Sequence, residues 1–132
     1  GLRGATAYAD SSKNNNIKHK AAIESDRGGF APRGFSLDGP LESMNLVKSW
    51  KYILEYYGLH DFSEGGTGAD INPLKANEPN ILLLGFLPES QRYFDHHHAT
   101  TDLFESVNRR ELELGSASIA AMLYLLDQYL TK

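Results

Sequence analysis

The run Asn-Ile-Leu-Leu-Leu-Gly-Phe, residues 80–86, places the strongest limit on how this chain folds. Its successive apolar positions are typical of a strand that is buried on both faces, not of one with a solvent-exposed face. A strand of this kind needs cover on either side of its sheet. Because other strand-like segments are separated by helical ones, the sequence predicts an α/β fold with a sheet covered on both faces.

Two helices are predicted with clear start or stop signals. Asn108 and Glu111 form a capping-box pattern, and the last helix follows it. The predicted apolar stripe of this helix is Leu112, Ser116, Ile119, Leu123, Leu126 and Leu130. An earlier helix begins near Pro40 and ends at Gly58, a residue typical of the position after a helix. Its apolar positions are Met44, Val47, Trp50 or Lys51, Leu54 and Tyr57.

Shorter elements fill the rest of the chain. Residues 3–12 predict a helix, and residues 19–25 predict a short strand. Residues 30–39 contain two glycines, one proline and two phenylalanines and predict an ordered loop. Residues 59–79 predict a second loop, with Ile71 and Leu74 as apolar anchors.

Composition excludes several classes of protein. With 132 residues and 41% hydrophobic residues, the chain has enough material for one core. No apolar run approaches the roughly 18 residues of a transmembrane helix, which predicts no membrane partner. A net charge of −4 and scattered basic residues argue against nucleic-acid binding. The basic pairs in residues 18–20 and 109–110 are interpreted as solvated edges. Without cysteine, the chain has no disulfide and no thiolate zinc site.

The segment Glu-Ser-Asp-Arg-Gly-Gly, residues 24–29, is the first candidate site. Asp26 follows a predicted strand, and open α/β sheets hold ligands at the carboxyl ends of their strands. The two glycines let the backbone come close to whatever Asp26 holds. The same residues are also typical of a turn that closes a strand, so the spacing alone leaves both interpretations open.

The segment Asp-His-His-His-Ala-Thr-Thr-Asp, residues 95–102, is the second candidate site. Histidine is a common zinc ligand, and a carboxylate often orients its other ring nitrogen, a role that Asp95 or Asp102 could take. In an extended segment alternate side chains face the same way, so at most two of the three histidines converge easily. A polar loop is the alternative interpretation.

Four segments taken together resemble the zinc-dependent exopeptidases of peptidase family M28, which includes the bacterial leucyl aminopeptidases. The nearest branch of the family contains plasma glutamate carboxypeptidase. The matching segments are residues 21–30, 68–74, 92–102 and 107–115. They occur in the order of the family and span most of the chain, which favours the metal-site interpretation of both candidate segments.

The resemblance implies a two-zinc site in which the two ions share a bridging aspartate. Within this chain it implies Asp26 as a ligand of one zinc ion and His98 as a ligand of the other. Asp102 is expected beside His98, where it would orient the ring or form a hydrogen bond near it. The family usually has tyrosine where His96 stands, so His96 and His97 are not implied as ligands.

The resemblance also implies a fold and a substrate. The expected fold is the C-terminal part of a phosphorylase/hydrolase-like aminopeptidase fold, an α/β arrangement with a mixed β-sheet flanked by helices. Gly68 and Asp70 fall in the segment that lines the substrate cleft of the family, so Asp70 is expected to face a peptide substrate. The implied mechanism is metal-assisted hydrolysis, in which the zinc pair activates a water molecule and a glutamate acts as general base.

Several groups of the family's site have no counterpart in this sequence. The first zinc histidine, the bridging aspartate, the catalytic glutamate and its neighbouring ligand glutamate all precede the segment that matches residues 24–26. Residues 1–4 resemble the residues that follow the glutamate pair. We therefore expect residues 1–132 to be the C-terminal segment of a single catalytic domain whose N-terminal part is absent, with no catalytic residue in this chain and the general base upstream of Gly1.

These implications define the expected behaviour of the parent and of the chain. The parent is expected to be a secreted or periplasmic exopeptidase, aminopeptidase-like, with two zinc ions. The chain alone is expected to bind zinc weakly or not at all, to hydrolyse nothing, and to form homo-oligomers through an exposed sheet edge. The alternatives are a non-catalytic binding or structural relative of the same fold and a one-zinc enzyme similar to glutaminyl cyclases.

Overall fold

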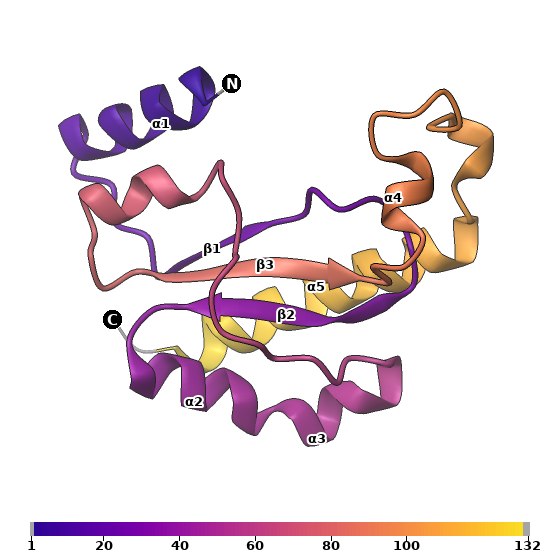
Figure 1. Cartoon of the computed structure of the whole chain (residues 1–132). Helices are drawn as coiled ribbons and strands as arrows, with labels where there is room; N and C mark the ends of the chain where they lie inside the picture. The colour runs from indigo at the N-terminus through magenta and orange to yellow at the C-terminus, as the bar shows by residue number, and fades with distance from the viewer. Residues whose placement is uncertain (1, 131–132) are drawn as a thin grey trace.

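A mixed three-stranded sheet with helices on both faces forms the centre of the described chain, residues 2–130 of the computed structural model (Figure 1). The strand order is β1-β3-β2. β1 (Ala21–Glu24) runs parallel to β3 (Leu82–Pro88), and β2 (Pro32–Asp38) runs antiparallel to it. The predicted α/β class, with a mixed sheet flanked by helices, is confirmed.

The central strand β3 carries the core on both of its faces. Leu82, Leu83 and Leu84 are each at most 1% exposed. Leu82 and Leu84 belong to one apolar cluster, whereas Leu83 belongs to a second cluster on the other face. Full burial of each leucine stabilises the fold by about 1.5–3 kcal/mol. The strand predicted at residues 80–86 is therefore confirmed, with its bounds shifted by two residues.

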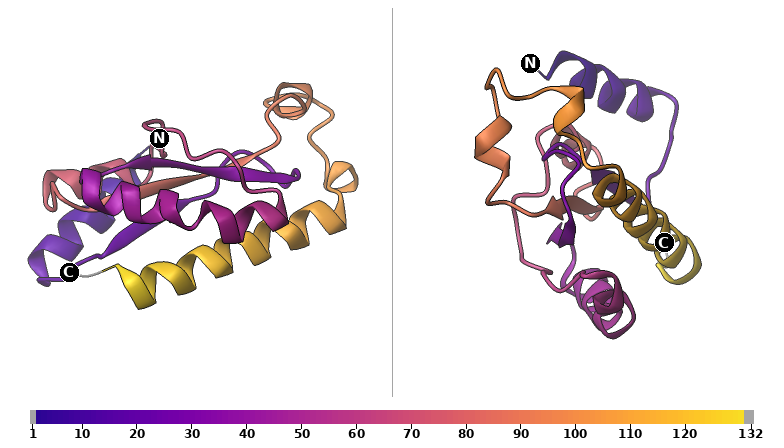
Figure 2. Two further views of the ribbon diagram at one scale, coloured as in Figure 1. Left: turned by 90° about the horizontal axis from the view of Figure 1, so that it is seen from below. Right: turned by 90° about the vertical axis from the view of Figure 1, so that its right-hand side faces the viewer.

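Each face of the sheet has its own set of helices. The larger cluster joins the sheet to α2 (Leu41–Ser49), α3 (Lys51–Leu54) and α5 (Arg109–Tyr129). The smaller cluster joins it to α1 (Arg3–Asn14) and the 3-10 helix η2 (Asn72–Ala76). Figure 2 shows α5 running along the length of the sheet. No helix in residues 2–130 is both long enough and apolar enough to cross a membrane.

The predicted helix after Pro40 is present but interrupted. It consists of α2, α3 and a 3-10 turn, η1 (Glu55–Tyr57), and it stops at Gly58 with a φ of 84°. A positive φ of this size suits glycine, which explains the stop. Tyr57, which was expected on the apolar face, is instead 57% exposed.

The last helix begins as predicted, but its buried face is rotated from the expected one. The Asn108 side chain accepts a hydrogen bond from the Glu111 backbone N–H at 3.1 Å. Leu112 and Leu123 of the predicted stripe are about half exposed, at 49% and 53%. The buried residues of the helix are Gly115, Ser118, Met122 and Leu126, so Leu126 of the predicted stripe is confirmed, as is Leu130 just after the helix. The small Gly115 lets the helix approach the Phe86 ring, because an added Cβ would lie 3.3 Å from that ring.

The prediction of a loop over residues 30–39 is wrong, because residues 32–38 form β2. Phe35 and Leu37 alternate along this strand, and both are fully buried. Gly34, one of the glycines behind the loop prediction, allows close approach of another segment. An added Cβ at Gly34 would lie 1.7 Å from the Asp61 carbonyl oxygen. The segment at Asp61 pairs with the outer edge of β2, so this glycine serves a tertiary contact.

The two edges of the sheet differ. The outer edge of β2 is covered by residues 60–65, through hydrogen bonds such as the Phe35 N–H to the Asp61 carbonyl at 2.9 Å. The outer edge of β1 forms no backbone hydrogen bond with any residue in 2–130. β1 is therefore the free edge of the described sheet.

Candidate functional site

The carboxyl ends of β1 and β3 lie at the same end of the sheet, and α4 (Tyr93–His96) lies beside that end (Figure 1). Because the two strands are parallel, the chain leaves each of them in the same direction. Asp26 follows β1 by two residues and is exposed. The histidine segment follows β3 and α4. This topology brings the two predicted site segments to one end of the molecule.

One hollow of about 630 Å³ is lined by both segments. Its polar lining residues include Asp26, His96, His97, His98 and Asp102. The structure therefore places Asp26, His98 and Asp102 around a shared space, although the first lies far from the others in sequence. Phe30, Val107 and Leu112 add apolar surface to the same hollow.

His98 has an unusual backbone conformation. Its φ is +53°, in the left-handed region, which few residues other than glycine adopt, although asparagine, aspartate and histidine adopt it more often than the rest. Such a conformation costs about 1–3 kcal/mol and tends to occur at functional sites. The ring meets the His97 ring edge-on, with 4.1 Å between centroids. It forms no hydrogen bond with a residue in 2–130, so both ring nitrogens are available to a ligand.

His96 is oriented by the backbone, which the sequence interpretation missed. Its Nδ1 lies 2.9 Å from the Thr101 carbonyl oxygen. A carbonyl oxygen only accepts hydrogen bonds, so Nδ1 carries the hydrogen and Nε2 is left as the acceptor. The Thr101 hydroxyl in turn donates to the Asp95 carbonyl at 2.6 Å. A carbonyl on one ring nitrogen is also the arrangement that orients histidine in metal sites.

Glu24, the last residue of β1, holds the predicted cleft segment in place. Its carboxylate accepts hydrogen bonds from the backbone N–H groups of Ala69, Asp70 and Ile71 at 3.2, 2.8 and 3.1 Å. Gly68 is needed for this approach, because an added Cβ would lie 2.2 Å from the Glu24 carboxyl carbon. The role of Glu24 was not predicted, since its partners come from a distant loop.

The two residues predicted for the substrate cleft lie differently. Gly68 and Asp26 both line a smaller hollow of about 180 Å³, together with Arg27 and Tyr93. Asp70 is exposed, and its backbone is fixed by Glu24. Gly68 thus shares a hollow with Asp26, while the Asp70 carboxylate forms no ion pair with any residue in 2–130.

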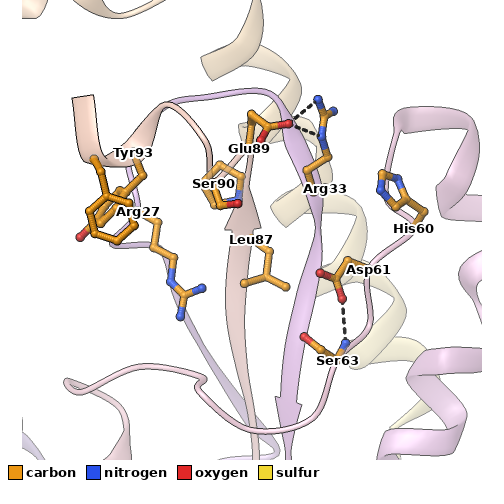
Figure 3. A pocket seen from close by; sticks show the side chains of 11 residues that line it. Arg27, Arg33, His60, Asp61, Ser63, Leu87, Glu89, Ser90 and Tyr93 are labelled. Atoms are coloured by element: carbon orange, nitrogen blue, oxygen red, sulfur yellow. Dashed lines mark hydrogen bonds and ion pairs between the residues drawn. The ribbon is translucent and has the colours of Figure 1, made fainter. Parts of the chain in front are cut away.

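A second large hollow, of about 850 Å³, adjoins the candidate site. Figure 3 shows Leu87 between two walls, with Arg27 and Tyr93 on one side and Asp61 and Ser63 on the other. Tyr93 lines this hollow, the 630 Å³ hollow and the 180 Å³ hollow. Tyr93 therefore borders all three spaces.

The described residues do not form a complete zinc site by themselves. Asp26 and His98 have the donor atoms that zinc prefers, a carboxylate oxygen and an imidazole nitrogen. A zinc ion is held by four protein ligands, or by three protein ligands and a water molecule. Residues 2–130 contain no group of three or more His, Asp or Glu side chains placed to hold a metal ion. Any zinc site that includes Asp26 or His98 needs ligands from elsewhere.

Comparison with known proteins gives a likeness in fold. No protein-family model and no curated protein sequence matches this chain. The crystal structure of a peptidase M28 precursor from Shewanella amazonensis matches it with a TM-score of 0.75 and 23% sequence identity. The match covers 96% of this chain and 28% of the other, so the chain spans less than a third of that protein. The chain therefore has the fold of one part of that protein.

Proposed function

We propose that residues 1–132 are part of a zinc-dependent exopeptidase in which Asp26 binds one of two zinc ions and His98 binds the other. One observation carries this proposal. Asp26 and His98 come from distant segments, yet they line one hollow beside the carboxyl ends of β1 and β3. The likeness in fold to part of a peptidase M28 precursor supports the same assignment.

The neighbouring residues have supporting roles in this proposal. Asp102 lines the same hollow as His98 and would orient its ring. A peptide substrate would enter beside Gly68, which lines a hollow with Asp26, and Asp70 would face it from the adjoining exposed loop. Gly28 and Gly29, which line the 630 Å³ hollow with Asp26, carry no side chain and would let a substrate backbone come close to it.

The chain supplies only part of the chemistry. Bound zinc would activate a water molecule and polarise the scissile carbonyl group. Asp26 and His98 provide one ligand for each ion, so the remaining ligands and a general base must come from residues outside 1–132. Residues 1–132 alone are therefore expected to bind zinc weakly and to hydrolyse no peptide.

The test uses the natural polypeptide that carries these residues, loaded with zinc. We expect it to release amino acids from dipeptides or from leucine p-nitroanilide, to lose this activity with a chelator, and to regain it with zinc. Asp26→Asn should abolish the release, whereas Asp127→Asn, on the exposed face of α5, should not. Hydrolysis that resists the chelator, or full activity in the Asp26→Asn protein, would contradict the proposal.

Two other outcomes would point to other functions of the same fold. A polypeptide that binds zinc at Asp26 but cleaves no peptide would be a non-catalytic binding relative. Cyclisation of N-terminal glutamine without peptide cleavage would indicate a one-zinc enzyme similar to glutaminyl cyclases. Dipeptides with a blocked amino terminus, compared with free ones, would separate aminopeptidase from carboxypeptidase activity.

A further inference from the structure

We infer that the 850 Å³ hollow binds a carboxylate group of the substrate and that Arg27 recognises it. The inference rests on the proposed function, because it takes the scissile bond to lie at Asp26. It adds a substrate class, peptides that carry a carboxylate next to the cleaved bond. The observations that support it are the position of Arg27, its charge environment and the shape of the hollow.

Arg27 lies between the candidate metal ligand and the hollow. It follows Asp26 directly in the sequence, and both residues line the 180 Å³ hollow. Arg27 also lines the 850 Å³ hollow, which Asp26 does not. A substrate bound at Asp26 would therefore lie beside Arg27, which borders the larger hollow as well.

The other charged groups of the hollow are already engaged. Arg33 donates from Nε and Nη2 to Glu89 at 3.0 and 2.9 Å. The backbone N–H of Gln91 and the Arg33 side chain hold the pKa of Glu89 below its ordinary value, so this pair stays ionised. The Asp61 carboxylate accepts the Ser63 backbone N–H at 3.1 Å. Arg33, Glu89 and Asp61 therefore already have partners within the protein.

Arg27 differs from these groups because no carboxylate pairs with it. Its Nη2 donates to the Gly66 carbonyl at 3.0 Å, and it forms no ion pair with any residue in 2–130. That contact anchors one arm of an exposed guanidinium and leaves its other N–H groups free. A guanidinium presents five N–H donors in a planar fork that matches the two oxygens of a carboxylate.

The shape of the hollow suits a short acidic group. Leu87 lies between the two walls in Figure 3 and gives an apolar base against which methylene groups can pack. Asp61 places negative charge on the wall opposite Arg27, which directs a carboxylate towards Arg27. His60, next to Asp61, lines the far side. The carboxylate could belong to an aspartate or glutamate side chain, or to the free carboxyl terminus of a dipeptide.

Kinetics with matched substrates separate these two sources in the zinc-loaded natural polypeptide. Glu-Ala amide against Gln-Ala amide tests the side-chain carboxylate, and Leu-Ala against Leu-Ala amide tests the terminal one. We expect Arg27→Gln to raise the KM of the acid about 10- to 100-fold in one of the two pairs. The KM of the matching amide should not change. Arg110→Gln, on an exposed arginine that lines neither hollow, is the control.

A second variant and a binding measurement keep the result clear. Arg27→Lys retains the charge but loses the planar fork, so it should recover part of the preference for the acid. Calorimetry on chelator-treated protein measures binding without cleavage. If Arg27 recognises a side-chain carboxylate, N-acetylglutamate should bind more tightly than N-acetylglutamine. If it recognises the terminal carboxylate, Leu-Ala should bind more tightly than Leu-Ala amide. This preference should disappear in Arg27→Gln.

The outcomes distinguish this inference from the proposed function. Peptide hydrolysis with no preference for either acid, or an equal effect of Arg27→Gln on acid and amide, overturns the inference and leaves the peptidase assignment intact. Arg27-dependent binding of the acid by a protein that cleaves nothing supports the carboxylate site and overturns the peptidase assignment.

Discussion

Two clusters of histidine and carboxylate residues lie at opposite ends of the parallel strands β1 and β3, one just before the strands and one after them. Figure 1 shows α1 near the first end and α4 near the second. In the cluster near α1, His19 Nδ1 lies 2.6 Å from Glu78 and Nε2 lies 2.9 Å from the Tyr8 hydroxyl. The side chains of His19 and Glu78 are only 14% and 13% exposed. In the cluster near α4, Asp26 and His98 are exposed and line an open hollow.

The comparison shows that residue type does not distinguish a structural cluster from a binding site. Both clusters contain an imidazole and a carboxylate, but in the first each group has a protein partner. The Glu78 carboxylate also accepts the His19 backbone N–H at 2.9 Å, which ties the segment before β1 to the segment before β3. A satisfied polar network of this kind stabilises a fold, whereas unpartnered donors around a hollow suit a ligand.

The largest expected effect is on activity and concerns Asp26. In the zinc-loaded natural polypeptide, Asp26→Asn should lower kcat/KM at least about 100-fold, because even the residues that orient metal ligands are worth 10- to 100-fold. The free energy of unfolding should change by less than about 0.5 kcal/mol, since Asp26 is exposed. Kinetics and urea unfolding measure the two quantities. An Asp26→Asn protein that is much less stable but still active would show that Asp26 stabilises the fold and does not bind a catalytic ligand.

The second effect is on stability and concerns the closed cluster. Glu78→Gln should lower the free energy of unfolding by about 1–3 kcal/mol, because it weakens the bonds to a mostly buried imidazole. The matched control is Glu113→Gln, which removes an exposed ion pair to Arg109 of the kind that contributes little. Urea unfolding of both variants checks this. Equal losses in the two would mean that the His19–Glu78 pair has no special role.

The same cluster should give the fold a dependence on pH. Burial raises the pKa of Glu78, but the hydrogen bonds from the His19 side chain and backbone outweigh it and hold the pKa below 4.5. A carboxyl with a lowered folded pKa stabilises the protein above its unfolded pKa and loses this contribution as pH falls through the folded value. The stability difference between wild type and Glu78→Gln should therefore narrow below about pH 4.5. If the stability difference between wild type and Glu78→Gln instead widened as the pH fell, the pKa of Glu78 would be raised by folding, not lowered.

A weaker effect is expected at β1, the strand that connects the two clusters. Its outer edge is unpaired among residues 2–130, and we propose that it pairs with a second copy of the chain. Because β1 has only four residues, the association should be weak and should appear only at high concentration. Sedimentation velocity of residues 1–132 over a wide concentration range measures this association. A sedimentation coefficient that stays at the monomer value throughout would contradict the pairing.

The smallest effect concerns the backbone of the open cluster. His98→Gly should raise the free energy of unfolding by about 0.5 kcal/mol, because relief of left-handed strain exceeds the entropy cost of glycine. Asn16 has the same φ of 53° and serves as a comparison, since a short asparagine side chain can hydrogen-bond locally in this conformation and Asn16→Gly should gain less. Thermal unfolding of both variants checks this. A loss of stability in His98→Gly would show that the His98 ring has a structural role.

Most of the elements were predictable, because their signals are local. The apolar run of β3, the Asn108 cap of α5 and the stop at Gly58 depend on residues close to one another in the chain. β2 was missed because the glycines and proline of residues 30–39, Gly34 among them, were interpreted as signs of an ordered loop. The real constraint on Gly34 is the Asp61 carbonyl, which belongs to a segment that no local pattern connects to it.

The candidate site was predictable only in its parts. Asp26 and His98 were named from separate segments, and the parallel pairing of β1 with β3 places both segments at one end of the sheet. Residues 18–20 were interpreted as a solvated edge, but the His19 side chain is mostly buried between two partners. Arg27 could be singled out only from the structure, because Arg33, the other arginine of the 850 Å³ hollow, is paired with Glu89 and Arg27 is not.

The sequence by itself determined the α/β class and the residue types available for chemistry, because periodicity and helix caps act over a few residues. The tertiary structure decided which of those residues are satisfied and which are open to a ligand. The reason is that their partners are remote: Glu78 lies 59 residues from His19, and the loop that Glu24 binds begins 45 residues after it. Only the folded chain brings such groups within hydrogen-bond distance or leaves them facing a hollow.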